Sequence, residues 1–141
     1  MNLKSWYSRA SDNWATPRNI YKFFMARGCY DPCPINAETD GLSIEWKERN
    51  FVNPPYSQLK KWVIKSIEEH KKGHEVTLLI PARTDTQAFK LLFEYGAKFT
   101  FITGRLAYNE TGTAPFPSML VTLTGWITTI ERIERDYYDH R

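Results

Sequence analysis

The sequence has no long apolar run, and the longest ones, such as residues 76–81, are short. A membrane-spanning helix needs about 20 consecutive apolar residues, so we expect no membrane partner. The first residues, Met-Asn-Leu-Lys-Ser-Trp, also lack the apolar centre of a signal peptide. We therefore expect a cytoplasmic protein, and the sequence leaves its oligomeric state open.

Metal ligands and net charge are also scarce. Two cysteines, Cys29 and Cys33, and three histidines do not show the spacing of a structural zinc site, which needs four ligands. We predict two free thiols in a reducing compartment and no metal site. The net charge is only +3, which favours a nucleic-acid partner mildly and excludes a polycationic binder.

Length and composition predict one globular domain. The chain has 141 residues, of which 42% are hydrophobic and 25% are charged. It contains no internal repeat, no low-complexity tract and no linker that would divide it. We expect an N-terminal arm over residues 1–12, a single domain over 13–131 and a charged C-terminal tail over 132–141.

Helical and strand patterns alternate along the chain. Thr16-Pro17 predicts a helix start, with threonine as the N-cap and proline in the first turn, and Gly28 ends that helix. Further helices are expected over residues 57–72 and 84–95. Short strands are expected at residues 29–31, 51–52, 76–80, 99–102 and 118–124, and residues 126–133 either extend the last strand or begin a terminal helix. This alternation predicts an α/β fold.

The helix expected over residues 57–72 has two different faces. Its apolar face carries Leu59, Trp62, Val63 and Ile67. The opposite face carries charged side chains that we expect in solvent, namely Lys60, Lys61, Lys65, Glu68 and Glu69.

A rigid turn, Asn53-Pro54-Pro55-Tyr56, follows one predicted strand and precedes this helix. Two prolines fix φ and remove two backbone donors, so the Pro54 carbonyl stays outside a helical hydrogen-bond ladder. In an α/β sheet such a turn lies at the carboxyl end of a strand, where ligands bind. Asn53, Pro54, Pro55 and Tyr56 are therefore our candidate catalytic residues.

The turn suits methylation of a planar amino group. The exocyclic amine of adenine is a poor nucleophile, because its lone pair is delocalised into the ring. The Asn53 side-chain oxygen and the Pro54 carbonyl could bind its two hydrogens and leave the lone pair free, while the Tyr56 ring stacks on the base. The alternative interpretation is a structural turn in which Asn53 caps the following helix.

Seven short motifs stand in one order along the chain. They are Trp14-Ala15-Thr16-Pro17, Tyr30-Asp31-Pro32-Cys33-Pro34 with Asn36, Gly41-Leu42 with Trp46, Asn53-Pro54-Pro55-Tyr56-Ser57, Pro81-Ala82-Arg83-Thr84-Asp85-Thr86, Gly104-Arg105-Leu106 and Ala114-Pro115-Phe116-Pro117-Ser118. In these motifs the chain resembles the small phage-encoded DNA adenine-N6-methyltransferases, the phage Dam-like family. The resemblance implies a Rossmann-like methyltransferase domain of phage or prophage origin, with S-adenosylmethionine as cofactor, a reduced central sheet and helices on both faces.

The resemblance also implies roles for individual residues. Thr16 and Pro17 would lie near the methionine end of the cofactor, whose carboxylate faces a helix N-terminus. Asp31 would accept a hydrogen bond from the cofactor amino group, although an aspartate before proline is by itself more typical of a turn. The implied cofactor-binding residues are Trp14, Thr16, Pro17, Asp31, Pro32, Cys33 and Asp40.

Two features depart from the family pattern. Pro32-Cys33-Pro34 replaces the glycine-rich loop that commonly follows the first strand. Asp31 and Asn53 are only 53 − 31 = 22 residues apart, whereas a βαβ unit takes about 30 residues or more. We therefore expect the ribose contact to come from the irregular segment between them, where the candidates are Glu38, Asp40 and Glu45, with Asp40 preferred.

DNA contacts are expected from loops that follow the later strands, because such loops carry function. The candidates are Ser57, Arg83, Arg105 and Tyr108, which could bind phosphates or fill the space left by a flipped base. We expect no separate target-recognition domain, so sequence readout would be weak, loop-borne or supplied by a partner. The helix lysines are more typical of a solvated polar face.

Two other functions stay open at this point. Asn-Pro-Pro-Tyr also occurs in enzymes that methylate the side-chain amide of glutamine in proteins, since that amide is planar like the adenine amine. A non-catalytic DNA-binding module that retains the fold is the second alternative, and the missing glycine-rich loop favours it. The basic pI near 8.8, the loop arginines and the whole-chain resemblance favour site-specific methylation of adenine in DNA.

Overall fold

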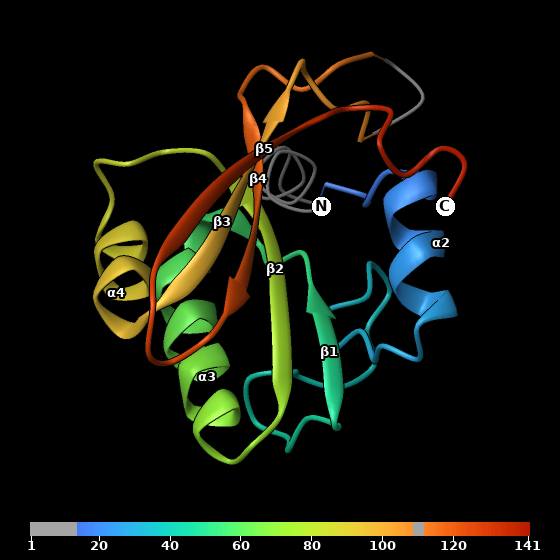
Figure 1. The fold of residues 1–141 in the computed structure, drawn as a ribbon. Coiled ribbons are helices and arrows are strands. Elements are labelled where there is room, and N and C mark those ends of the chain that lie inside the picture. The colour runs from blue at the N-terminus through green and yellow to red at the C-terminus, as the bar shows by residue number, and fades with distance from the viewer. Residues whose placement is uncertain (1–13, 109–111) are drawn as a thin grey trace.

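A computed structural model describes residues 14–108 and 112–141 of the chain. Figure 1 shows a twisted sheet with helices packed against both of its faces. The helices are α2 (Arg18–Ala26), the short 3-10 helix η1 (Tyr56–Gln58), α3 (Leu59–Lys71) and α4 (Gln87–Tyr95), and the strands are β1 (Arg49–Val52), β2 (Glu75–Pro81), β3 (Ala97–Thr103), β4 (Ser118–Leu123) and β5 (Thr129–Glu134). In these described ranges no helix has the length and apolar character to cross a membrane. The expected N-terminal arm, residues 1–12, lies outside the described residues.

The sheet has mixed strand directions and the order β1-β2-β4-β3-β5. β1 is parallel to β2 and β3 is parallel to β5, whereas β4 lies antiparallel between β2 and β3. The carboxyl ends of β1, β2, β3 and β5 therefore meet at one edge, the upper edge in Figure 1. Segments that follow these strands converge there, which is the arrangement expected for the loops that carry candidate residues.

Each face of the sheet has its own core, because neighbouring strand residues point to opposite sides. On one face Leu78 and Ile80 pack with α3 and α4. On the other face Leu79 and Phe51 pack with Phe24 of α2. This two-sided packing confirms the predicted α/β fold class, with helices on both faces.

The strand expected at residues 29–31 is reduced to one parallel bridge between Tyr30 and Asn50. The Tyr30 N–H donates to the Arg49 carbonyl at 2.8 Å, and the Phe51 N–H donates to the Tyr30 carbonyl at 2.9 Å. The ladder stops there because Pro32 and Pro34 have no N–H to continue it. The central sheet is therefore reduced, as expected.

The prediction for residues 126–133 was wrong in both of its forms. After a turn at Gly125, which has a φ of 77°, the chain forms a separate strand, β5. Glu131 on this strand accepts a hydrogen bond from Thr100 at 2.8 Å. β5 continues to Glu134, so the boundary expected at residue 131 falls inside a strand. Tyr138 packs further along, with its ring centroid 4.6 Å from that of Phe23 in α2.

Glu69 was expected in solvent, but it is fully buried. Its Oε1 accepts a hydrogen bond from the Trp46 N–H at 2.6 Å, and the Lys72 Nζ lies 2.9 Å from its Oε2. Burial alone would raise the pKa of this carboxyl, but the Trp46 N–H and the nearby lysines outweigh burial and lower the pKa. Glu69 thereby joins α3 to the loop that precedes β1, a contact that helical periodicity does not reveal.

Replacing Glu69 with Gln should lower the free energy of unfolding by about 1–3 kcal/mol, because it weakens a buried charge-assisted hydrogen bond. Since the folded-state pKa of Glu69 is lowered, its contribution is complete above the ordinary value of 4.5 and disappears as the pH falls through the folded-state pKa. Urea unfolding between about pH 7 and pH 3 measures both effects. Glu68→Gln, at an exposed neighbouring position, is the control, and equal stability of Glu69→Gln and wild type at pH 7 would contradict this account.

Candidate active site

The tetrapeptide Asn53-Pro54-Pro55-Tyr56 lies where the sequence predicts it, between the end of β1 and η1. Pro54 is buried, and the Pro55 carbonyl accepts a hydrogen bond from the Gln58 N–H at 3.1 Å. Among residues 14–108 and 112–141, no backbone N–H donates to the Pro54 carbonyl. This carbonyl is thus outside the helical ladder, as the two prolines require.

Asn53 does not cap the following helix, so the capping role in the alternative interpretation of the turn was wrong. The N-cap positions of η1 and α3 are Pro55 and Gln58, and neither helix has a side-chain cap. The Asn53 amide instead faces the segment that leads into α2. Its Nδ2 donates to the Trp14 carbonyl at 2.5 Å and to the Thr16 Oγ1 at 3.0 Å.

These two contacts fix the orientation of the Asn53 amide. A backbone carbonyl only accepts hydrogen bonds, so the NH₂ group must face Trp14 and the oxygen Oδ1 must point the other way. The Tyr56 hydroxyl lies 3.5 Å from Oδ1, at the long limit of a hydrogen bond. Oδ1 is therefore held as an acceptor that retains capacity for a stronger donor.

Thr16 was expected to be the N-cap of the first helix, and the structure corrects this. The N-cap is Pro17, and no side chain caps α2. The Thr16 hydroxyl accepts the Asn53 amide instead. The helix itself begins and ends close to the predicted positions, because the start at Pro17 and the stop at Gly28 depend on backbone conformation.

An aromatic cluster surrounds the tetrapeptide. The Tyr56 ring packs edge-on against Phe116, with centroids 5.3 Å apart, and Trp14 packs edge-on against Phe116 at 5.5 Å. Burial, followed by the neighbouring Tyr108 hydroxyl, raises the pKa of Tyr56. Tyr56 is therefore a neutral phenol with a fixed ring. No role was predicted for Phe116, although it lies in one of the seven motifs.

Tyr108 was expected to contact DNA, but its side chain is only 3% exposed. Its hydroxyl lies 2.7 Å from the Ser118 Oγ at the start of β4, and burial raises the pKa of the phenol. Tyr108 thus supports the aromatic cluster from inside. The polar residues near it in the sequence predicted that the Tyr108 side chain is exposed. It packs instead in the core on one face of the sheet, together with Leu106 and Phe116.

A pocket of about 250 Å³ adjoins the tetrapeptide. It brings together Asn53 and four of the predicted cofactor residues, Trp14, Thr16, Asp31 and Cys33. Its other lining residues are Ala15, Tyr21, Pro34 and Ile35. Sequence reasoning missed Tyr21 and Ile35; helical spacing from Pro17 could have placed Tyr21, whose N–H donates to the Pro17 carbonyl at 3.0 Å.

Asp31 fulfils the turn interpretation and also lines the pocket. Its Oδ1 accepts a hydrogen bond from the Cys33 N–H at 2.9 Å, which is the expected turn before the prolines. Burial raises the pKa of this carboxyl, and the Cys33 N–H partly offsets the effect. The pocket thus has one hydrogen-bond acceptor of carboxylate type on its wall.

The remaining cofactor candidates, Pro17, Pro32 and Asp40, are not among the lining residues of this pocket. Pro17 and Pro32 are buried, and the exposed Asp40 carboxylate accepts a hydrogen bond from the Leu42 N–H at 3.0 Å. The next residue, Gly41, packs so closely that a Cβ there would lie 2.0 Å from the Pro32 carbonyl oxygen. This segment therefore supports the Pro32 turn from outside, and a ribose contact from Asp40 stays a prediction.

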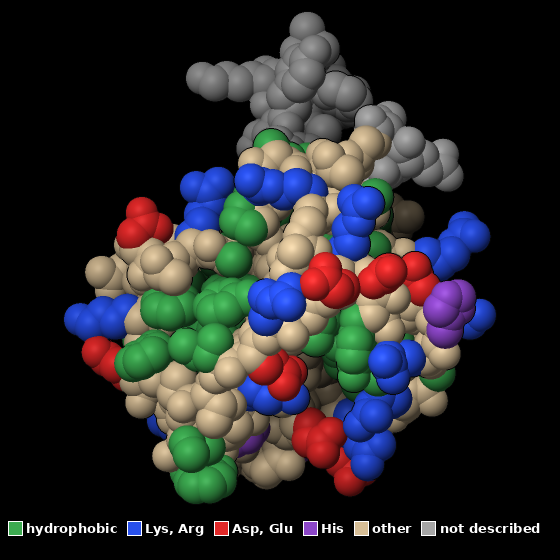
Figure 2. Space-filling model, turned by 45° about the horizontal axis from the view of Figure 1, so that its top comes forward, with side chains coloured by type: hydrophobic (Ala, Val, Ile, Leu, Met, Phe, Trp, Pro, Cys, Tyr) green, Lys and Arg blue, Asp and Glu red, His purple; other side chains and the backbone are tan. Residues whose placement is uncertain are grey.

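The candidate DNA-binding residues other than Tyr108 are exposed at the same sheet edge. Arg83 follows β2, Arg105 follows β3, and Ser57 lies in η1. In Figure 2, where this edge comes forward, lysine and arginine side chains are spread over the upper part of the surface. Acidic side chains lie among them, so the edge that holds the tetrapeptide carries charges of both signs.

Comparison with known families agrees with this arrangement of fold and turn. Residues 32–133 match the family model described as DNA N-6-adenine-methyltransferase (Dam). The match covers more than half of the chain, which therefore belongs to this family. Membership of a methyltransferase family implies a methyl donor. The match begins after Asp31, so it includes Asn53 and Tyr56 but not Trp14 or Thr16.

Two individual proteins are similar to the chain. The DNA N-6-adenine-methyltransferase of Escherichia phage T1 is 29% identical over 116 residues, which cover 72% of this chain and 49% of that protein. The chain thus spans about half the length of this curated relative. A crystal structure of a predicted O-methyltransferase from Agrobacterium tumefaciens has a TM-score of 0.43 and 16% identity, over 67% of this chain and 44% of that one, which is too distant to support an argument.

Proposed function

We propose that this protein transfers the methyl group of S-adenosylmethionine to the exocyclic amine of adenine in DNA. The observation that carries the proposal is the Asn53 amide, whose two donors are bound to Trp14 and Thr16, so that Oδ1 is presented as an acceptor. Asn53 follows the carboxyl end of β1 and lines the pocket in which we place the cofactor. Membership of the DNA N-6-adenine-methyltransferase family and the likeness to the phage T1 protein support the choice of substrate.

Asn53 Oδ1 and the Pro54 carbonyl would accept the two hydrogens of the adenine amine. Holding both hydrogens favours a geometry in which the nitrogen lone pair turns out of the ring system, toward the methyl carbon. Because both acceptors are fixed before the base arrives, they need no reorganisation during transfer. The new N–C bond forms as the C–S bond breaks, and the amine then loses one of the hydrogen-bonded protons to water.

Tyr56 would hold the target base after it leaves the DNA stack. Its ring is fixed by Phe116, and its phenol is neutral, so it offers a rigid apolar surface. Stacking of a base on an aromatic side chain contributes about 1–3 kcal/mol. Extrusion of the base is necessary because the reacting amine is otherwise paired within the duplex.

The pocket beside Asn53 fits the methyl donor by its chemistry. The Asp31 carboxylate can accept from a primary amino group, and Tyr21 and Ile35 offer apolar walls for a flat ring. S-adenosylmethionine, when bound, supplies an electrophilic methyl group on its sulfonium. The proposed binding residues are Trp14, Thr16, Pro17, Asp31, Pro32, Cys33 and Asp40. Thr16 lines the pocket and also contacts Asn53, so it joins the donor side to the acceptor side.

Incubation with labelled S-adenosylmethionine and unmethylated duplex DNA should yield 6-methyladenine, as resolved by mass spectrometry of the nucleosides. Asn53→Ala should lower turnover by about 10²–10³-fold, because it removes one preorganised acceptor. Its affinity for the cofactor, measured by calorimetry, should fall much less than the turnover does, because Asn53 is one of nine residues that line the pocket. Cofactor binding without transfer to DNA, but with transfer to a glutamine-containing protein, would replace the substrate assignment, and absence of cofactor binding would overturn the enzyme assignment.

Thr16→Val should lower turnover by about 2- to 10-fold, because it removes one acceptor of the Asn53 amide, worth about 0.5–1.5 kcal/mol, while keeping the side-chain shape. Thr16→Ser retains the hydroxyl and should recover most of the activity. The turnover number at saturating cofactor distinguishes positioning of Asn53 from loss of cofactor binding. Equal turnover of the Val and Ser variants would show that the Thr16 hydroxyl does not position Asn53.

A further inference from the structure

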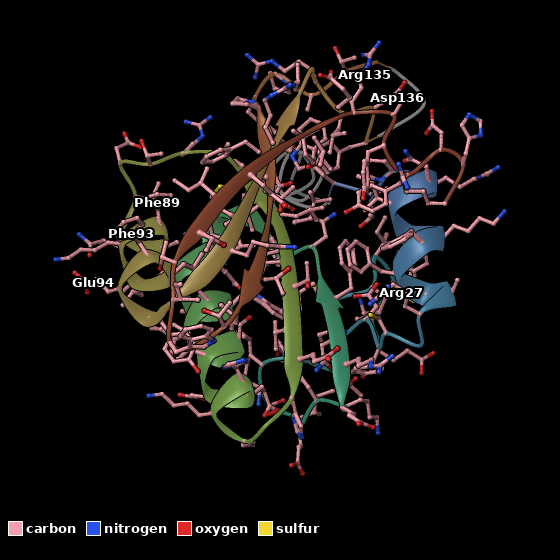
Figure 3. The ribbon with its side chains drawn as sticks, viewed as in Figure 1. Arg27, Phe89, Phe93, Glu94, Arg135 and Asp136 are labelled. Atoms are coloured by element: carbon pink, nitrogen blue, oxygen red, sulfur yellow. The ribbon has the colours of Figure 1, made fainter. Side chains whose placement is uncertain are left out.

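Three arginines from separate segments line one hollow of about 310 Å³. Arg18 begins α2, Arg105 follows β3 and Arg135 follows β5. Figure 3 labels Arg135 at the upper edge of the molecule, next to Asp136. Only Arg105 was singled out by the sequence, because the other two come close to it through the fold.

The three guanidinium groups have no ion-pair partner in the described part of the chain. No carboxylate oxygen of residues 14–108 or 112–141 lies within 4.0 Å of any of them. By contrast, Arg132 on β5 lies 2.6 Å from Glu134. Unpaired guanidinium groups at one place are available to an external anion.

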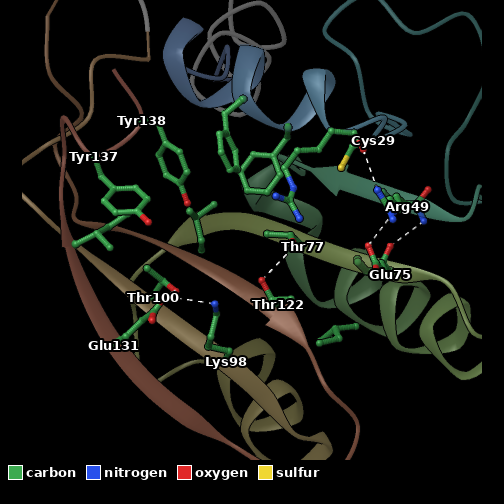
Figure 4. Close-up of a pocket in the computed structure, with 18 of the residues that line it drawn as sticks. Cys29, Arg49, Glu75, Thr77, Lys98, Thr100, Thr122, Glu131, Tyr137 and Tyr138 are labelled. Atoms are coloured by element: carbon green, nitrogen blue, oxygen red, sulfur yellow. Dashed lines mark hydrogen bonds and ion pairs between the residues drawn. The ribbon is translucent and has the colours of Figure 1, made fainter. Parts of the chain in front are cut away.

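A larger cavity elsewhere in the described part of the chain shows a different pattern. It has a volume of about 460 Å³ and lies over the sheet face beside α2, away from the tetrapeptide (Figure 4). Arg49 lies 3.4 Å from Glu75 there, and Lys98 lies 3.4 Å from Glu131. Arg49 and Lys98 are therefore less available to an external anion than the three arginines of the smaller hollow.

The position of the Arg135 side chain depends on the absence of a side chain at Gly104. A Cβ on Gly104 would lie 3.0 Å from the Arg135 Cδ, so the arginine stem lies directly against this glycine. Gly104 also has a φ of 89°, which L side chains rarely adopt. Close approach at Gly104 thus brings Arg135 beside Arg105.

Two carboxylates also line the hollow and set its net charge. They are Asp136 and Asp139, so three arginines and two aspartates give 3 − 2 = +1. Asp139 is engaged by Asn19, whose Nδ2 donates to its Oδ1 at 2.8 Å. A net charge of +1 complements one phosphodiester, which carries one negative charge, and guanidinium groups bind phosphate oxygens in bidentate fashion.

The hollow adjoins the candidate active site. Pro17 lines it, and the preceding residue, Thr16, lines the other pocket and binds the Asn53 amide. An anion in the hollow would therefore lie one residue along the chain from the group that orients Asn53. For a nucleic acid, this is the place of a backbone phosphate near the extruded base.

We propose that Arg18, Arg105 and Arg135 form a binding site for one DNA backbone phosphate close to the target adenine. The inference rests on the proposed function and deepens it. Phosphate contacts fix the register of a protein on DNA without reading its sequence. The site thereby holds the strand while the adenine enters the space beside Asn53.

The test is equilibrium binding of a fluorescent DNA duplex to the full chain at several salt concentrations. The triple variant Arg18→Gln, Arg105→Gln, Arg135→Gln should reduce the slope of log K against log salt by about 0.9, the value for one lost phosphate contact. Asp136→Asn should strengthen binding, because it removes a negative charge from the hollow. The triple variant Arg27→Gln, Lys71→Gln, Lys90→Gln has the same charge change at exposed positions outside the hollow (Figure 3 labels Arg27), so it is the matched control and should keep the wild-type slope.

The outcomes separate this site from the proposed function. An unchanged slope in the triple variant, or an equal decrease in the matched control variant, overturns the phosphate site while wild-type binding and methylation leave the proposed function standing. Failure of the wild-type protein to bind DNA at all overturns both. Thermal unfolding and cofactor binding of each variant should match wild type, so that a decrease in slope reports the lost phosphate contact and not loss of the fold.

Discussion

Both hydrogens of the Asn53 amide are bound by the short segment that leads into α2, one by the Trp14 carbonyl and one by the Thr16 hydroxyl. These bonds join residues that are 39 and 37 positions apart in the sequence. They hold the start of α2 against the end of β1, and they keep Trp14 in contact with Phe116. The pocket wall, the aromatic cluster and the orientation of the proposed acceptor therefore depend on one side-chain amide.

The face of the sheet that α3 and α4 cover and the edge where its parallel strands end differ in what they contribute. The face supplies packing, and the edge carries the candidate functional residues. α3 and α4 cover one face, and the buried Glu69 ties α3 to the loop before β1 through Trp46. The carboxyl ends of β1, β2, β3 and β5 meet at the upper edge in Figure 1. Loops at that edge supply Asn53, Arg83 and Arg105 from positions outside the core, whereas Tyr108 of the loop that follows β3 packs into it.

Much of the fold follows from local signals in the sequence. α4 begins after its N-cap Thr86 and ends before Gly96, close to the helix predicted over residues 84–95, because a hydroxyl cap and a glycine stop act within one turn. The predictions that failed required knowledge of distant partners: Thr16 binds Asn53 instead of capping α2, Glu69 meets Trp46, and residues 126–133 pair with β3 as a new strand. Asn53 and Asp31, which lie in separate sequence motifs, line one pocket, whereas the burial of Tyr108 and the approach of Arg18 and Arg135 arise only from packing.

Hydrogen exchange of the two Asn53 Nδ2 protons tests most directly whether the amide is held by Trp14 and Thr16. In a protein labelled with ¹⁵N on asparagine side chains, Asn53→Ala identifies the signal by its disappearance. Because both protons are bound to Trp14 and Thr16, both should exchange more slowly than those of the exposed Asn36. Exchange of either Asn53 proton at the rate of Asn36 would contradict the anchored amide, and with it the presentation of Oδ1 to the adenine amine.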